Sequence, residues 1–115
     1  MKLTEQKSKP ILKGARPLSQ AEVSALMREI PQWSLSERSI GREFRFTDFR
    51  EAMEFVNQVA AIANDEDHHP DLFISYNKVR ATLSTHKIQG LSMNDFIVAA
   101  KIDDSANRQQ RGKAA

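Results

Sequence analysis

Three histidines, the only ones in the chain, fall within a stretch of 19 residues: His68, His69 and His86. Imidazole has an ordinary pKa of about 6.5, so it can give or take a proton near neutrality, and its nitrogens also bind zinc well. The pattern indicates either proton transfer or a metal site. From spacing alone it is equally plausible that the histidines form no site, with His68 and His69 in a loop and His86 at an exposed strand end. The helices and strands around the histidines determine whether the three side chains can come together.

The helix before His68 is predicted to begin at Thr47 or Asp48, both good N-caps, and to run to about residue 64. Seven apolar residues recur along it at helical intervals: Phe49, Ala52, Met53, Val56, Val59, Ala60 and Ala63. A stripe of this breadth is typical of a helix lying on a sheet. An acidic turn with His68 and His69 follows it.

Two strands, 72–76 and 79–85, are predicted after that turn, joined by the tight link Asn77-Lys78. Side chains alternate along a strand, so Val79, Ala81 and Leu83 share one face. Arg80, Thr82, Ser84 and His86 then belong to the opposite, polar face or its rim. A hairpin that returns toward its own start can bring His86 close to His68.

The remaining elements complete an αββαββα order. Ser19 and Glu22 have capping-box spacing at the start of a helix over 20–29, which Pro31 ends. Strands are expected at 33–36 and 42–46, with Gly41 in their connection, and a last helix after Gly90. This order favours an α+β fold, a four-stranded antiparallel sheet with three helices packed on one face.

The chain of 115 residues has no cysteine and no apolar run long enough to cross a membrane, and its start lacks the apolar core of a signal peptide. We expect one domain at 17–104, a flexible basic N-terminal tail at 1–16 and a flexible tail at 105–115, in the cytoplasm. The first 17 residues carry +4 and the last 13 carry +1, leaving −3 between them. Neither nucleic acid nor membrane is therefore expected as a partner.

The segment 63–95 resembles the signature of the pterin-4a-carbinolamine dehydratases. The resemblance rests on several independent spacings: His-His-Pro at 68–70, Tyr76 with Asn77-Lys78-Val79, Leu-Ser-Thr-His at 83–86, Gly90-Leu91-Ser92, and Asp95. Weaker likeness over Trp33, Phe44-Arg45-Phe46 and Asp48-Phe49 extends it across most of residues 19–102. The family fold it implies, a four-stranded antiparallel sheet with helices on one side, agrees with the predicted element order.

The resemblance also implies a reaction, the dehydration of a 4a-hydroxytetrahydropterin to the quinonoid dihydropterin, with no cofactor or metal. This hydro-lyase would recycle the tetrahydropterin cofactor of an aromatic amino acid hydroxylase, and would form a homodimer or homotetramer. Loss of water requires a proton on the 4a-hydroxyl and removal of the N5 proton, for which His68 and His86 are the expected acid and base in either order. His69 would bind the pterin or assist.

The resemblance also assigns roles to other positions. The resemblance places substrate contacts at Asp67, Ser84, Thr85, Lys87 and, as one of two options beside strand packing, Tyr76. Three more residues are assigned supporting roles: Asn64, Pro70 and Asp95. Asp95 could cap the last helix or orient a histidine. Family members usually carry an ionisable residue at position 64, one helical turn before His68, where asparagine adds no charge.

Two alternatives stay open. Relatives of this family also serve as dimerisation cofactors or assembly factors, so the chain could be a protein-binding module with little catalysis. The three histidines speak against a purely non-catalytic member, because a scaffold has no need of all three. The other alternative is a three-histidine zinc site, for which adjacent histidines are awkward ligands.

Overall fold

The computed structural model describes residues 2–114, with side chains through residue 111. Its elements are η1 (Leu3–Glu5), α1 (Gln20–Met27), β1 (Ser34–Ser36), β2 (Ser39–Arg45), α2 (Phe49–Glu66), β3 (Asp71–Ser75), β4 (Lys78–Leu83), η2 (His86–Ile88) and α3 (Met93–Ala114). The two η elements are single 3₁₀ turns. The predicted αββαββα order of helices and strands is confirmed.

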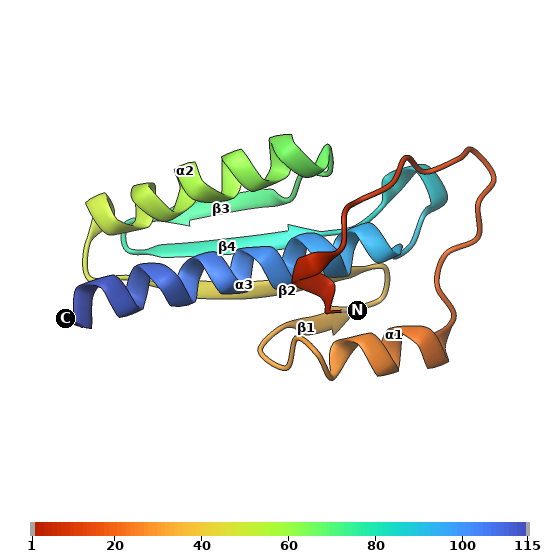
Figure 1. Cartoon of the computed structure of the whole chain (residues 1–115), viewed down its shortest axis with the longest axis horizontal. Coiled ribbons are helices and arrows are strands. Elements are labelled where there is room, and N and C mark those ends of the chain that lie inside the picture. The colour runs from red at the N-terminus through yellow and green to blue at the C-terminus, as the bar shows by residue number, and fades with distance from the viewer. Residues whose placement is uncertain (1, 115) are drawn as a thin grey trace.

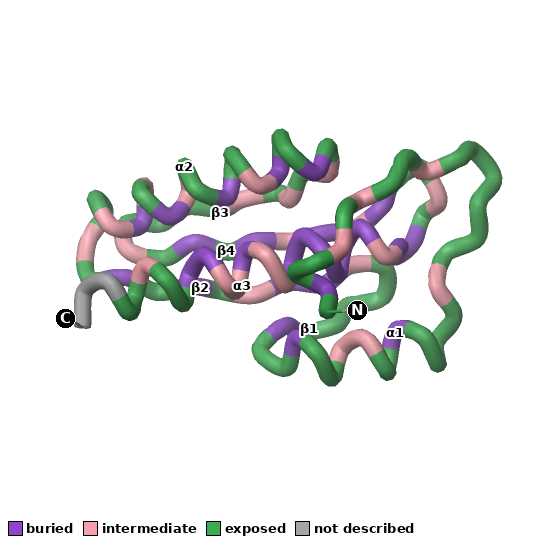
Figure 2. Tube along the Cα trace, in the orientation of Figure 1, coloured by how far each residue is buried: buried purple, intermediate pink, exposed green. Residues whose placement is uncertain are grey.

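The four strands form one antiparallel sheet in the order β1-β2-β4-β3, and α2 and α3 lie over it side by side (Figure 1). Val79, Ala81 and Leu83 are fully buried on the face toward the helices, as their alternation predicts. Figure 2 shows the same pattern as buried segments along β4 and α3. The predicted α+β class with helices on one face is confirmed.

The sheet differs from prediction at its turns. Ser75 pairs with Lys78, so the β3–β4 turn is Tyr76-Asn77 rather than Asn77-Lys78. Tyr76 adopts a left-handed φ of 52°, a conformation that turn preferences assign first to glycine or asparagine. Gly41 was expected in a connection but lies inside β2, where a Cβ atom would come within 2.7 Å of an Arg80 guanidinium nitrogen.

Both end segments contact the core. The α3 helix continues through 105–112, where a flexible tail is expected, because Ala106 enters the core and Gln109 donates to the Glu51 carbonyl at 3.0 Å. At the other end Leu3 is only 4% exposed and η1 packs against α3. Apolar periodicity is absent from both segments, so it could not indicate these contacts. Flexibility of either segment stays a prediction.

Candidate functional site

A left-handed residue at the end of α2 aims the first two histidines. Asp67 caps the helix at φ 50° and ψ 42°, the His68 N–H donates to the Ala63 carbonyl, and the Asp67 N–H donates to the Asn64 carbonyl. These two bonds form a Schellman turn, which closes the open carbonyl end of a helix and sends the chain away from its axis. His68 consequently faces the start of α3.

His68 meets a buried carboxylate there. Its Nε2 lies 2.6 Å from Asp95 Oδ1, and the Asp95 side chain is fully buried. The other oxygen, Asp95 Oδ2, accepts from the Thr85 hydroxyl at 2.7 Å and from the Ser92 N–H at 2.9 Å. Asp95 therefore makes both contacts considered from the sequence, one with the first turn of α3 and one with a histidine.

The second histidine has a different neighbour. His69 is exposed, and its Nε2 lies 3.1 Å from Asn64 Oδ1. The expectation that Asn64 would neighbour His68 is wrong: the Schellman turn points His68 toward α3 and leaves His69 beside Asn64. His68 does have a charged partner, Asp95, which lies 27 positions later in the chain. The absence of a carboxylate at position 64 thus bears on His69.

The third histidine follows β4. The strand ends at Leu83, and His86 is an exposed residue that opens η2, so it lies beyond the predicted strand face. The Thr85 N–H donates to the Gly90 carbonyl at 2.9 Å and closes the small loop that carries His86. Because the Thr85 hydroxyl also binds Asp95, one carboxylate fixes the segments that hold both His68 and His86.

One open cavity of about 630 Å³ receives all three histidines. This volume is in the range of small-molecule sites. Its wall includes seven of the predicted site residues: Asp67, His68, His69, Ser84, Thr85, His86 and Lys87. Asp95 lies behind His68, while Asn64 and Pro70 border the His69 loop without lining the cavity. Tyr76, which was expected either to pack on its strand or to line the pocket, is 63% exposed in the turn at the far end of β4 and does not line this cavity.

Eight further residues line the same wall and were not among the predicted site residues: Lys7, Ser8, Lys9, Pro10, Ile11, Asp65, Glu66 and Asn94. The first five come from the segment assigned to a tail, whose polar composition carries no signal of docking. In residues 2–114 no group of three or more histidine, aspartate or glutamate side chains is arranged to hold a metal ion. None of the described helices has the length and apolar character needed to cross a bilayer.

Glu66 is the buried charge of this wall. Its side chain is 1% exposed and lies 2.6 Å from Lys101 Nζ, while the Ser8 N–H donates to it at 2.7 Å. Burial by itself raises the pKa of the Glu66 carboxyl, but the Lys101 and Ser8 hydrogen bonds and the lysine charges outweigh it, so the pKa is lowered from the usual 4.5. Ionised Glu66 thus links Ser8, near the start of the sequence, to Lys101 in α3.

The lowered pKa of Glu66 predicts acid sensitivity. A carboxyl whose pKa is lower in the folded state stabilises the fold above its unfolded pKa, and this contribution disappears as pH falls through the folded value. We expect Glu66→Gln to lower Tm at about pH 7 and to flatten the fall in Tm below the usual value of 4.5. Circular dichroism melts across this range measure both effects. The exposed Glu29, changed to Gln, is the control; equal acid slopes for Glu66→Gln and wild type would contradict the assignment.

The fold and the site define an α+β domain whose histidines share one polar cavity. The chain belongs to the pterin 4 alpha carbinolamine dehydratase family, whose sequence model matches residues 16–105. A protein of Nitrosospira multiformis named "Putative pterin-4-alpha-carbinolamine dehydratase" is 46% identical over 101 residues, covering 88% of this chain and 89% of the relative. A relative of the same name from Halorhodospira halophila is 41% identical, covering 90% of this chain and 96% of its own.

Two solved structures are similar. The transcriptional coactivator/pterin dehydratase from Brucella melitensis superposes with a TM-score of 0.76 at 34% identity, covering 79% of this chain and 99% of the other. A pterin dehydratase-like protein described as a RuBisCO assembly factor in the alpha-carboxysome has a TM-score of 0.54 at 19% identity, covering 64% and 86%. The second likeness extends to the fold alone.

Proposed function

We propose that this protein dehydrates a 4a-hydroxytetrahydropterin to the quinonoid dihydropterin and water. The observation that carries the proposal is the pair of His68 with the buried Asp95, 2.6 Å apart, at a cavity that His69 and His86 also line. A histidine oriented by a buried carboxylate is a common arrangement for moving protons. Membership of the dehydratase family names the substrate on which that arrangement would act.

The reaction needs two proton transfers. One imidazolium protonates the 4a-hydroxyl, the C4a–O bond breaks, and water leaves. A neutral imidazole removes the proton from N5, so that the nitrogen lone pair forms the C4a=N5 double bond as the oxygen departs. His68 and His86 supply the acid and the base in either order. Asp95 stabilises the positive charge that His68 carries when it is protonated.

Substrate binding would use the rest of the cavity wall. His69 and Asp67 come from the end of α2, while Ser84, Thr85 and Lys87 surround His86. These side chains and main-chain groups can pair with the amide edge of a pterin ring. The Thr85 hydroxyl is bonded to Asp95, and its N–H and carbonyl are bonded to Gly90 and Ile88, so Thr85 shapes the wall while its neighbours offer the free polar groups. The proposed reaction uses no cofactor.

The exchange of Asn64 tests how His69 takes part. In Asn64→Glu a carboxylate would come within reach of His69 Nε2, which now lies 3.1 Å from Asn64 Oδ1, and would favour the protonated ring. We expect one limb of the pH profile of kcat/KM to move to higher pH. Asn64→Gln lengthens the side chain without adding charge, so its pH profile of kcat/KM should match that of wild type. An unmoved limb in Asn64→Glu removes this position from the mechanism.

Oligomer formation and protein binding belong to the same proposal. The edge strand β3 exposes Phe73 (70%) and leads into the exposed Tyr76, and an edge strand of this kind favours pairing with another chain. From family membership we propose that the protein acts in the cytoplasm and is coupled functionally to an aromatic amino acid hydroxylase. The exposed edge strand supports a homodimer or homotetramer. It also keeps a protein-binding role as the second candidate. That role predicts a folded protein without dehydratase activity.

The direct test is an assay of the purified full chain on synthetic 4a-hydroxytetrahydropterin. We expect dehydration to be faster than the spontaneous reaction and in proportion to protein concentration. Ultraviolet absorbance follows the quinonoid product. A rate equal to that of buffer, from protein whose circular dichroism shows it folded, would contradict the enzymatic proposal and favour the binding role.

A further inference from the structure

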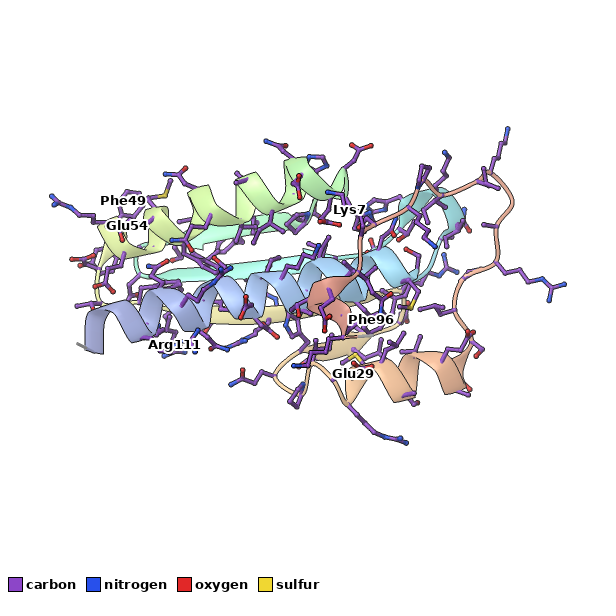
Figure 3. All side chains as sticks on the ribbon, viewed as in Figure 1. Lys7, Glu29, Phe49, Glu54, Phe96 and Arg111 are labelled. Carbon is purple, nitrogen blue, oxygen red and sulfur yellow. The ribbon has the colours of Figure 1, made fainter. Side chains whose placement is uncertain are left out.

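The N-terminal wall, defined as Lys7 to Ile11, forms a third of the residues around the candidate cavity: five of the fifteen lining positions. It comes from outside the predicted domain and crosses the open side of the site. Figure 1 shows the N-terminal segment running across α3 toward the end of α2, and Figure 3 places Lys7 where the two meet. We propose that this wall is a substrate-positioning element that must be docked for tight pterin binding.

The first contact lies beside the histidine pair. Glu66, two residues before His68, accepts from the Ser8 N–H at 2.7 Å. Lys7 Nζ lies 2.9 Å from Asp65 Oδ2 and 3.6 Å from Glu66 Oε2. The exposed Lys7–Asp65 pair contributes little by itself, but the bond to the buried Glu66 is desolvated and directional. The wall is thus anchored to the turn that aims His68.

The second contact lies beside Asp95. The Asn94 side chain accepts from the Lys9 N–H at 3.0 Å and donates to the Lys9 carbonyl at 2.7 Å. This paired arrangement copies the exchange of bonds between two strands and fixes the orientation of the Lys9 peptide groups. Asn94 itself is 6% exposed. The residue next to the carboxylate that orients His68 therefore also holds the wall.

The third contact lies beside His86. Lys87 Nζ donates to the Ile11 carbonyl at 2.9 Å. Each segment that carries the proposed chemistry, at His68, Asp95 and His86, thus has a neighbouring residue that binds the main chain of the wall. Leu3 adds an apolar anchor further along, 4% exposed against the core. A wall seated only for stability would not need a separate contact at each of these three places.

The inference rests on the proposed function, since a pterin is the ligand that the wall would position. It predicts that loosening the wall weakens pterin binding without altering the histidines. Leu3→Ala removes the apolar anchor, and Asn94→Ala removes both bonds to Lys9. Neither change adds a charge, and Leu3 does not line the cavity. Ser105→Ala is the matched control, because Ser105 is a buried polar residue of α3 that bonds to Gln58 instead.

The experiment is a calorimetric titration of the full chain and each variant with 7,8-dihydrobiopterin. We expect Asn94→Ala to raise Kd about fivefold or more, the effect of losing one or two hydrogen bonds. Leu3→Ala should raise Kd by a similar factor because it removes the apolar anchor of the wall, and Ser105→Ala should match wild type. Tm values check that every variant is folded. In the dehydratase assay KM should rise with kcat nearly unchanged.

Trypsin gives a readout that does not depend on catalysis. Cleavage after Lys7 requires the wall to separate from Glu66. Dihydrobiopterin should therefore slow this cleavage in wild type, and it should slow the cleavage of Asn94→Ala to a smaller extent. Wild type that fails to bind the pterin overturns the proposed function. If wild type binds the pterin, and Leu3→Ala and Asn94→Ala show the same Kd and the same protection from trypsin as wild type, the role of the wall is overturned while the proposed function stands.

Discussion

Replacing His68 or His86 by alanine is expected to lower kcat for dehydration by about 10²- to 10⁴-fold, the usual contribution of one positioned acid or base. KM should change less, because the seven predicted residues that line the cavity include several polar groups besides these two. The double variant should be little slower than the slower single variant, since acid and base act in one step. Stopped-flow absorbance, corrected for spontaneous dehydration, measures the rates.

The matched control is Lys78→Ala. Lys78 is an exposed residue at the start of β4, the end of the strand opposite His86. It should retain wild-type kcat and KM. His69→Ala completes the series and is expected to affect KM more than kcat if it binds the pterin. Rates for both His68→Ala and His86→Ala that equal wild type would rule out histidine acid/base catalysis.

Asp95→Asn is expected to show the effect of the Asp95 charge on the reaction, because asparagine keeps the shape of the side chain and removes its charge. The Ser92 N–H and the Thr85 hydroxyl both point at Oδ2, so the amide oxygen must take that place and the amide NH₂ must face His68. An NH₂ group can donate to an unprotonated Nε2 but opposes a protonated one. We expect kcat to fall about 10²-fold and the acid limb of its pH profile to move to lower pH.

Asp103→Asn is the control for that result. Asp103 is a second carboxylate on α3, where it accepts from Trp33 Nε1 at 2.8 Å and from Arg42 at 2.6 Å, away from the cavity. Burial raises the pKa of Asp103 even though Trp33 and Arg42 oppose the shift. Asp103→Asn should lower Tm without shifting the pH profile of kcat. A profile in Asp95→Asn that does not move would show that Asp95 acts only on the fold.

The sequence predicted well what depends on local pattern. Capping at Ser19 is confirmed with both bonds of the capping box, and Asp48 caps α2. The buried alternation of Val79, Ala81 and Leu83 is confirmed because period two belongs to any strand with one covered face. Motif likeness then selected the three histidines, which share one cavity.

What the sequence could not predict depends on geometry between distant segments. The partner of His68 lies 27 positions away, and only the left-handed turn at Asp67 decides that His68 rather than His69 reaches it. Tyr76 was expected either to pack on its strand or to line the pocket, yet it lies exposed in a turn that the six-residue strand β4 separates from His86. The N-terminal wall carries no periodicity, since its main chain rather than its side chains makes most of the contacts.

The wall also sets an order of assembly during synthesis. Its bonds join residues 58, 76 and 85 positions apart, so Ser8, Ile11 and Lys9 leave the ribosome long before Glu66, Lys87 and Asn94 exist. Contacts of such separation close late, after the local hairpins and helices have formed. The cavity therefore cannot be completed before residue 94 has been made, and a nascent chain that has already folded its sheet still lacks a finished binding site.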